Sequence, residues 1–302
     1  RAIDQHIKGF KALGATVEIA HGMITAEASH LCGAHIYLDV VSVGATINIM
    51  MAAALAEGRT TIENAAKEPH VVDLANFLTK MGANIQGAGT RRIVIEGVEK
   101  LRGCNHTVIP DRIEAGTFMV AAAMMGDGVT LRRVCEEHMT VVTDLLRKCG
   151  HHVEFNERGD TVTIIAGKTP KCGEIKTAPY PGYPTDMQAQ MTALFATTPG
   201  ISVVKDTIFP QRFMHCSELK RMGADIKVDN GTAVISGVET LSGAPVMASD
   251  LRASAALVLA ALKAEGTTEI HRLYHIDRGY EMIDEKLLAI GAAVERLPDD
   301  DN

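Results

Sequence analysis

The sequence lacks tryptophan, and aromatic residues make up only 4% of its 302 residues. The sequence therefore offers few aromatic side chains on which the bases of a single-stranded nucleic acid could stack. Positive charge is not in excess either, because 30 Lys and Arg stand against 37 Asp and Glu, giving a formal net charge of −7. This mild acidity argues against a nucleic-acid partner, although a few local arginines can still bind a small anion.

Long apolar runs and metal or phosphate motifs are also missing. The most apolar segment, residues 253–262, is much shorter than the ~20 residues that cross a bilayer. The six cysteines include no CxxC pair, and the chain opens without a signal-peptide pattern. No HExxH pair, Gly-rich phosphate loop or nucleophile elbow occurs. We therefore expect a cytoplasmic protein with reduced thiols, no metal, no cofactor and no membrane contact.

What the sequence does contain is a repeat. A glycine that follows an amphipathic helix recurs at positions 14, 82, 150, 223 and 291, at intervals of 68, 68, 73 and 68 residues. Glycine fits the position after a helix because it adopts the left-handed conformation without a Cβ clash. Two short strands follow, and a Leu-x-Gly element at residues 31–33, 101–103 or 241–243 leads into another strand. A helix of small residues and a final Gly-x-Thr strand complete a βαβαββ-like unit of ~70 residues.

The two helices of each unit differ in character. The helix around residues 217–221 carries charges and must face solvent, whereas the one at 253–261 is alanine-rich and apolar all round, and should be buried. Buried helices surrounded by strands predict an α/β fold in the form of an inside-out barrel, with helices inside and sheets outside. The chain length favours about two domains.

The starts of the predicted buried helices are the candidate functional positions. They lie at residues 41–46, 110–114, 184–188 and 249–253, and each offers a Ser, Thr or Asp that can cap a helix. Their N-termini should gather at one end of each domain and form an anion site, although simple capping stays open for each turn. Arg252 opposes the helix dipole in such a turn, which favours an anionic ligand.

We expect His151 and His152 to be exposed or half-buried at a strand start, and Cys216 to pack in the core.

Seven segments in order resemble the enolpyruvyl transferase family, and within it the UDP-N-acetylglucosamine 1-carboxyvinyltransferases. The resemblance extends over essentially the whole chain, and its most specific segments are residues 1–4, 42–46, 110–117, 184–190, 212–215, 250–254 and 274–280. The resemblance implies two inside-out α/β barrel domains that face a cleft and together hold six βαβαββ units. Residues 1–110 would be a partial nucleotide-sugar-side domain, and residues 111–302 the second domain.

The same resemblance implies a transferase of peptidoglycan synthesis, and so of cell-wall biogenesis, cell shape and cell division. The 3-hydroxyl of UDP-N-acetylglucosamine would add to C2 of phosphoenolpyruvate while C3 is protonated, and the intermediate would then expel phosphate. These two substrates are the expected partners, with no nucleic acid and no obligate protein partner.

The resemblance also implies the site residues. Asp186 matches the base near the sugar hydroxyl, with a helix cap as its alternative role. Arg252 and Arg278 match arginines on the phosphoenolpyruvate side, with surface ion pairs as their alternative. The remaining matches are substrate-binding residues: Arg1, Ala2, Ile3, Asp4, Gln5, Val40, Val41, Ser42, Val43, Gly44, Ile208, Arg212 and Asp250. The family usually has Pro at the position of Ala2 and often a basic residue at that of Val40, whereas Asp111 and Arg112 are expected to be structural.

Six units would need ~420 residues, and the present chain holds about four. The resemblance therefore implies a piece of a longer protein without the mobile loop and its cysteine, and we expect the 302-residue polypeptide alone not to release phosphate. Two alternatives stay open. One is a catalytically incompetent fragment or binding remnant. The other is 3-phosphoshikimate 1-carboxyvinyltransferase, which needs Asp-His-Arg where this sequence has Asp-Leu-Arg at 250–252.

Overall fold

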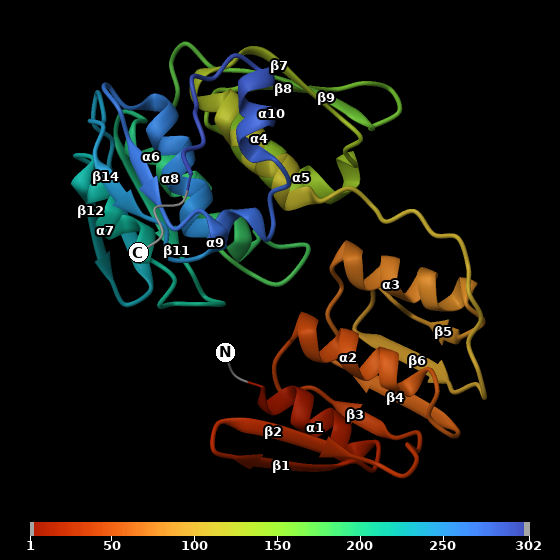
Figure 1. Cartoon of the computed structure of the whole chain (residues 1–302). Helices are drawn as coiled ribbons and strands as arrows, with labels where there is room; N and C mark the ends of the chain where they lie inside the picture. The colour runs from red at the N-terminus through yellow and green to blue at the C-terminus, as the bar shows by residue number, and fades with distance from the viewer. Residues whose placement is uncertain (1–2, 299–302) are drawn as a thin grey trace. The chain divides into compact units, whose positions relative to one another are not determined.

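The computed structural model describes residues 3–298, and contacts divide the chain into two units (Figure 1). Unit 1 contains the described residues up to Ile109 together with residues 179–181. Unit 2 contains the described residues from Pro110 onward, apart from that short segment. Among residues 3–298, no helix combines the length and apolar character that a membrane span requires.

Unit 1 is a mixed α/β structure with a four-stranded sheet in the order β3-β4-β6-β5 and a separate two-stranded sheet, β1-β2. Strands β3 and β4 are parallel, and the other pairs are antiparallel. Leu13, Ile36, Ile49, Ile62 and Ile93 are fully buried or nearly so in its core. Its elements are α1 (Asp4–Ala12), β1 (Thr16–Ala20), β2 (Met23–Glu27), β3 (His35–Tyr37), α2 (Val43–Ala53), β4 (Arg59–Glu63), α3 (Pro69–Lys80), β5 (Asn84–Gln86) and β6 (Arg92–Glu96).

Unit 2 holds three sheets, ordered β10-β11-β13-β12, β7-β9-β8 and β14-β15. Its first half consists of α4 (Arg112–Met125), β7 (Asp127–Arg132), α5 (Glu136–Lys148), β8 (His152–Phe155), β9 (Thr161–Ile165), β10 (Glu174–Lys176), the 3₁₀ turn η1 (Thr185–Met187), α6 (Gln188–Ala196) and β11 (Ile201–Lys205). Its second half consists of α7 (Met214–Arg221), β12 (Asp225–Asp229), β13 (Thr232–Ser236), β14 (Pro245–Met247), α8 (Leu251–Lys263), β15 (Glu269–His271), α9 (Tyr274–Asp277) and α10 (Ile283–Ala289).

Three helices of unit 2 are packed against one another in its interior. Helices α4, α6 and α8 are in mutual contact. Every residue of α6 is buried, and α4 is buried from Gly116 to Met124. Their alanines, glycine and threonines are small, so the helix backbones can approach closely. Helices α5 and α7 instead bury one apolar face and expose charged residues, as their amphipathic patterns predict.

The repeat is confirmed at the helix ends. The glycines at 14, 82, 150, 223 and 291 follow α1, α3, α5, α7 and α10, and each has a positive φ between 90° and 107°. In three repeats the strand before the buried helix pairs in parallel with the strand after it, as β3 with β4, β10 with β11 and β14 with β15. The same local sequence pattern therefore produces the same local structure several times.

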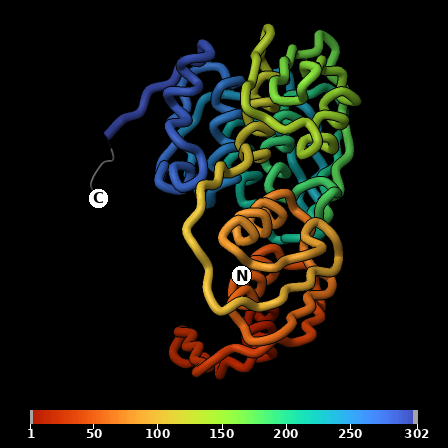
Figure 2. The backbone as a smooth tube through the Cα atoms, turned by 90° about the vertical axis from the view of Figure 1, so that its right-hand side faces the viewer, coloured from red at the N-terminus to blue at the C-terminus, as the bar shows by residue number. Residues whose placement is uncertain are grey.

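Two expectations were wrong. The Leu-x-Gly element at 101–103 does not lead into a strand: residues 101–111 form an irregular segment (Figure 2). That segment runs from unit 1 into α4 of unit 2, so it cannot pair with β7 as its counterparts pair in the other repeats.

His151 is buried, with 5% of its surface exposed, and its Nδ1 lies 3.2 Å from the Gly167 amide nitrogen, which donates to it. Burial lowers the pKa of this histidine.

Candidate active site

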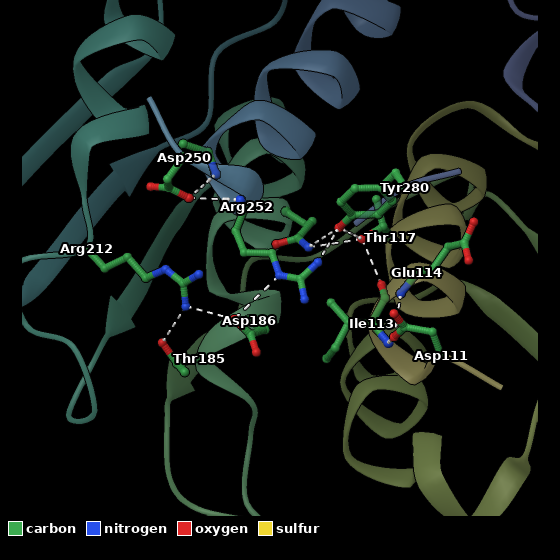
Figure 3. Close-up of polar contacts among 12 residues, drawn as sticks. Asp111, Ile113, Glu114, Thr117, Thr185, Asp186, Arg212, Asp250, Arg252 and Tyr280 are labelled. Atoms are coloured by element: carbon green, nitrogen blue, oxygen red, sulfur yellow. Dashed lines mark hydrogen bonds and ion pairs between the residues drawn. The ribbon is translucent and has the colours of Figure 1, made fainter. Parts of the chain in front are cut away.

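Asp186 lies in the 3₁₀ turn that precedes α6, but its side chain does not cap a helix. One carboxylate oxygen, Oδ1, accepts a hydrogen bond from Arg212 Nη1 at 2.9 Å and lies 3.4 Å from Arg252 Nε (Figure 3). The Asp186 side chain is 41% exposed, whereas those of Arg212 and Arg252 are only 15% and 12% exposed. The turn thus presents a partly accessible carboxylate between two largely buried cations.

The charge state of Asp186 follows from these neighbours. Burial alone would raise the pKa of the carboxyl, but the positive charges of Arg252 and Arg212 and their hydrogen bonds lower it below its usual value. The group is therefore ionised at neutral pH. It can accept a proton, and its affinity for that proton is held down as long as both guanidinium groups face it.

Arg252 lies in the first turn of α8, which Asp250 caps by accepting hydrogen bonds from the amides of Arg252 at 2.8 Å and Ala253 at 3.0 Å. A cation is unfavourable at a helix N-terminus, so its charge needs other partners. Arg252 Nη1 donates to the hydroxyl oxygen of Tyr280 at 3.1 Å, on the other side of the guanidinium from Asp186 (Figure 3). The cation is thus held between a carboxylate and a buried hydroxyl.

Behind Tyr280, a buried hydrogen-bond network joins the first two turns of the three interior helices. The hydroxyls of Tyr280 and Thr117 of α4 lie 2.8 Å apart. Gln190 of α6 donates through Nε2 to Thr117 Oγ1 at 3.0 Å and to the Tyr280 hydroxyl at 3.3 Å. The predicted gathering of N-termini is therefore seen for α4, α6 and α8.

A different carboxylate, which is buried, organises the loop that carries Arg212. Asp206 is 2% exposed and accepts hydrogen bonds through Oδ1 from the amides of Ile208 at 2.9 Å and Phe209 at 2.8 Å. It also accepts from the hydroxyls of Thr177 at 2.8 Å and Thr185, the neighbour of Asp186, at 2.7 Å. One side chain thus fixes both segments from which Asp186 and Arg212 project.

Unit 1 has its own polar group at the start of α1 and α2. Gln5 accepts from the Asp39 amide at 2.9 Å and donates to the Asp39 carboxylate at 3.2 Å, while Lys8 Nζ lies 2.8 Å from the same carboxylate. Hydrogen bonds from Lys8 and Gln5 lower the pKa of Asp39. Ser42 caps α2 by accepting from the Ala45 amide at 3.3 Å. Contacts thus join the start of α1 to the turn before α2.

Comparisons with known proteins agree with this arrangement. The family model of EPSP synthase (3-phosphoshikimate 1-carboxyvinyltransferase) matches residues 1–287. The chain is 87% identical over its whole length to UDP-N-acetylglucosamine 1-carboxyvinyltransferase of Akkermansia muciniphila, and it covers 72% of that protein. It is 58% identical over 98% of its length to UDP-N-acetylglucosamine 1-carboxyvinyltransferase 1 of Caldanaerobacter subterraneus subsp. tengcongensis, 71% of which it covers. The chain belongs to the UDP-N-acetylglucosamine 1-carboxyvinyltransferase family.

Solved structures support the same fold. The enolpyruvyl transferase NikO from Streptomyces tendae matches with a TM-score of 0.88 at 27% identity, covering 97% of this chain and 72% of that one. EPSP synthase from Acinetobacter baumannii matches with a TM-score of 0.73 at 21% identity, over 98% of this chain and 72% of that one, which supports the fold alone. The prediction of an α/β enolpyruvyl transferase of the 1-carboxyvinyltransferase family is confirmed.

The predicted site residues of this 1-carboxyvinyltransferase family member fall into separate groups. Asp186, Arg212, Asp250 and Arg252 lie together in unit 2, and Ile208 belongs to the loop fixed by Asp206. Ile3, Asp4, Gln5, Val40, Val41, Ser42, Val43 and Gly44 lie in unit 1 around the starts of α1 and α2. Arg1 and Ala2 lie outside the described residues. Among the described residues, no group of three or more His, Cys, Asp or Glu side chains could hold a metal ion.

The structure shows no side-chain contact between Arg278 and the Asp186 group. Arg278 follows α9 at the protein surface, where its backbone N–H donates to the Ile276 carbonyl oxygen, and within the described part of the chain its side chain forms no hydrogen bond or ion pair. Sequence reasoning missed Tyr280, two residues further on, and Asp206. Tyr280 lies inside a segment that carried the resemblance, and Asp206 directly follows a strand, but neither position alone indicates which partners the side chain will meet.

Proposed function

We propose that the full-length product of the gene that encodes this chain transfers the enolpyruvyl group of phosphoenolpyruvate to the 3-hydroxyl of UDP-N-acetylglucosamine, with release of phosphate, in peptidoglycan synthesis. The observation that carries the proposal is the position of Asp186: an accessible, ionised carboxylate that caps no helix and lies between two guanidinium groups. A proton acceptor beside cationic anion-binding groups is what the addition of a hydroxyl to an anionic enol ester requires.

The reaction consists of an addition and an elimination. In the addition, the sugar oxygen forms a bond to C2 of phosphoenolpyruvate, its proton passes to Asp186, and C3 gains a proton. In the elimination, C3 loses a proton, the double bond re-forms, and the bond from C2 to the phosphate oxygen breaks. Arg212 and Arg252 would hold the carboxylate or phosphate of phosphoenolpyruvate through charge-assisted hydrogen bonds. Arg278, whose side chain forms no hydrogen bond or ion pair within residues 3–298, would add a further guanidinium group for the anion.

Substrate binding would also strengthen the base. The guanidinium groups of Arg212 and Arg252, which lower the pKa of Asp186, would also bind the incoming anion. The negative charge of the anion would then offset part of their positive charge. The carboxylate would then lose some of their stabilisation, and its affinity for the hydroxyl proton would rise.

The nucleotide sugar would bind to unit 1. We assign it to the starts of α1 and α2, where Asp4, Ser42 and the free amides of the first turn of α2 can meet the ribose and the diphosphate. We also propose that the fold is an inside-out α/β barrel, with residues 1–110 on the nucleotide-sugar side and residues 111–302 as the second domain. The mutually packed helices α4, α6 and α8 support it.

The test uses the full-length product of the gene. Phosphate release is measured with phosphoenolpyruvate and either UDP-N-acetylglucosamine or 3-phosphoshikimate as acceptor. We expect phosphate release when UDP-N-acetylglucosamine is the acceptor and none when 3-phosphoshikimate is the acceptor. Release only with 3-phosphoshikimate would replace the proposal by the sister activity, and binding of both ligands without release would identify an incompetent remnant. Cell fractionation tests the predicted cytoplasmic location.

A further inference from the structure

We infer that Tyr280 is a positioning residue for Arg252, and that its buried hydroxyl oxygen holds the guanidinium ready for the phosphoenolpyruvate anion. The inference rests on the function proposed above. Tyr280 is 1% exposed, and its hydroxyl lies 3.1 Å from Arg252 Nη1. The Tyr280 hydroxyl forms no hydrogen bond with the Asp186 carboxylate, so any effect of Tyr280 on the site passes through Arg252.

The direction of the hydrogen bonds gives the hydroxyl one defined orientation. Thr117 Oγ1 lies 2.8 Å from the carbonyl oxygen of Ile113 and donates its only hydrogen there. It must therefore accept the hydrogen of Tyr280 at 2.8 Å. The Tyr280 oxygen then turns its lone pairs towards the two nitrogen donors, Arg252 Nη1 and Gln190 Nε2.

Without this acceptor, few contacts would fix the guanidinium. The carboxylate that forms an ion pair with Arg252 is that of Asp186, which is 41% exposed and also bound by Arg212. A long side chain held at one end regains rotamer freedom, and Arg252 would then have to be ordered again each time the anion binds. The Tyr280 ring also lies beside the guanidinium, 5.6 Å from its central carbon to the ring centroid. Phenylalanine retains that ring and its volume, so Tyr280→Phe removes the hydroxyl alone.

Unit 2 supplies a matched control in Tyr183. This tyrosine is also buried, at 6% exposed, but its hydroxyl has no hydrogen-bond partner within the described structure. Tyr183→Phe therefore removes the same atom from the same unit without touching Arg252. A second variant, Thr117→Val, removes the acceptor that orients the Tyr280 hydroxyl and leaves Tyr280 itself in place.

The first measurement is steady-state phosphate release by the full-length gene product. We expect Tyr280→Phe to raise KM for phosphoenolpyruvate about ten-fold, the effect of one hydrogen bond to a charged group, while KM for UDP-N-acetylglucosamine stays within about two-fold. Thr117→Val should shift KM for phosphoenolpyruvate in the same direction by less, and Tyr183→Phe should leave it unchanged. Equal rises in both KM values with a lowered unfolding midpoint would mean that Tyr280 only supports the fold, and would overturn the inference.

The second measurement does not depend on activity. The ¹⁵N resonance of the Arg252 guanidinium, assigned with Arg252→Lys, reports how freely the group rotates. It should show restricted rotation in the parent and in Tyr183→Phe, and free rotation in Tyr280→Phe. If the parent releases no phosphate but the resonance responds in this way, the proposed function fails and the positioning role stands. If the resonance is the same in all three proteins, the inference fails whatever the turnover.

Discussion

Replacing Asp186 by asparagine separates the role of its charge from the role of its shape. Asparagine keeps the size of the side chain and one oxygen for Arg212, but it cannot take the proton of a hydroxyl at neutral pH. Loss of a general base reduces turnover by ~100-fold or more. Affinity for phosphoenolpyruvate should not fall, because the substitution leaves Arg212 and Arg252 with more positive charge for the anion.

The structure also sets the cost in stability. Hydrogen bonds to charged groups contribute ~1.5–3 kcal/mol each, but Asp186 is 41% exposed, so solvent screening reduces the loss to about 1–2 kcal/mol for the Arg212 and Arg252 contacts together. The folded-state pKa of Asp186 is lowered. Its stabilisation is therefore complete above the unfolded pKa of ~3.9 and is lost as the pH falls through the folded pKa. Parent and variant should unfold at different urea concentrations at pH 7 and converge below about pH 4.

The assay pairs phosphate release with urea unfolding, and Asp284→Asn serves as the control. Asp284 also accepts from an arginine, Arg296, at 3.2 Å, and its side chain is 26% exposed, but it does not contact the Asp186 group. The control should lose a comparable amount of stability and keep its turnover. Near-normal turnover of Asp186→Asn, or equal loss of turnover in both variants, would refute the assignment of Asp186 as the base.

Three further substitutions test other parts of the structure. Arg278→Lys should weaken phosphoenolpyruvate binding by ~1–3 kcal/mol, because lysine cannot form the bidentate hydrogen bonds of a guanidinium group. Titration of UDP-N-acetylglucosamine should show little change in affinity, and equal losses of affinity for both ligands would contradict this role. Asp206→Asn should lower the free energy of unfolding by about 2–4 kcal/mol, since an amide cannot accept all four hydrogen bonds made by the buried carboxylate, and an unchanged urea midpoint would argue against it. His215 is 1% exposed, and burial lowers its pKa to about 4. Its neutral form therefore stabilises the fold fully above pH ~6.5, and up to roughly 3 kcal/mol of the free energy of unfolding should be lost as the pH falls from 6.5 to 4. His215→Gln should remove this part of the pH dependence of stability, and an identical pH profile in parent and variant would refute the prediction.

The local architecture could be predicted from the sequence because it depends on local patterns. The recurring glycines mark helix ends, and the apolar stretches of α6 and α8 mark interior helices, since these properties follow from neighbours within one or two turns. The strand expected after Leu101 did not form, because pairing depends on where the partner strand lies, and the segment leads instead into the other unit.

The polar contacts of the site could be predicted only in part. The resemblance pointed to Asp186 and Arg252, and the mismatch between a cation and a helix N-terminus independently drew attention to Arg252. Tyr280 and Thr117 are separated by 163 residues along the chain, and no periodicity in the sequence indicates that their hydroxyls meet. From the sequence, Asp186 could also have capped a helix, whereas the structure places its carboxylate beside Arg212 and Arg252.

The two-stranded sheet β1-β2 of unit 1 has a consequence for local dynamics. Nearly all of its residues are exposed, and each strand has a single partner, whereas β4 and β6 are hydrogen-bonded on both sides. An isolated antiparallel pair is only marginally stable in water, so this hairpin should open without unfolding the rest of unit 1. Its amide hydrogens should therefore exchange with deuterium long before those of β4 and β6, and the hairpin should be the first segment of unit 1 that a protease cleaves.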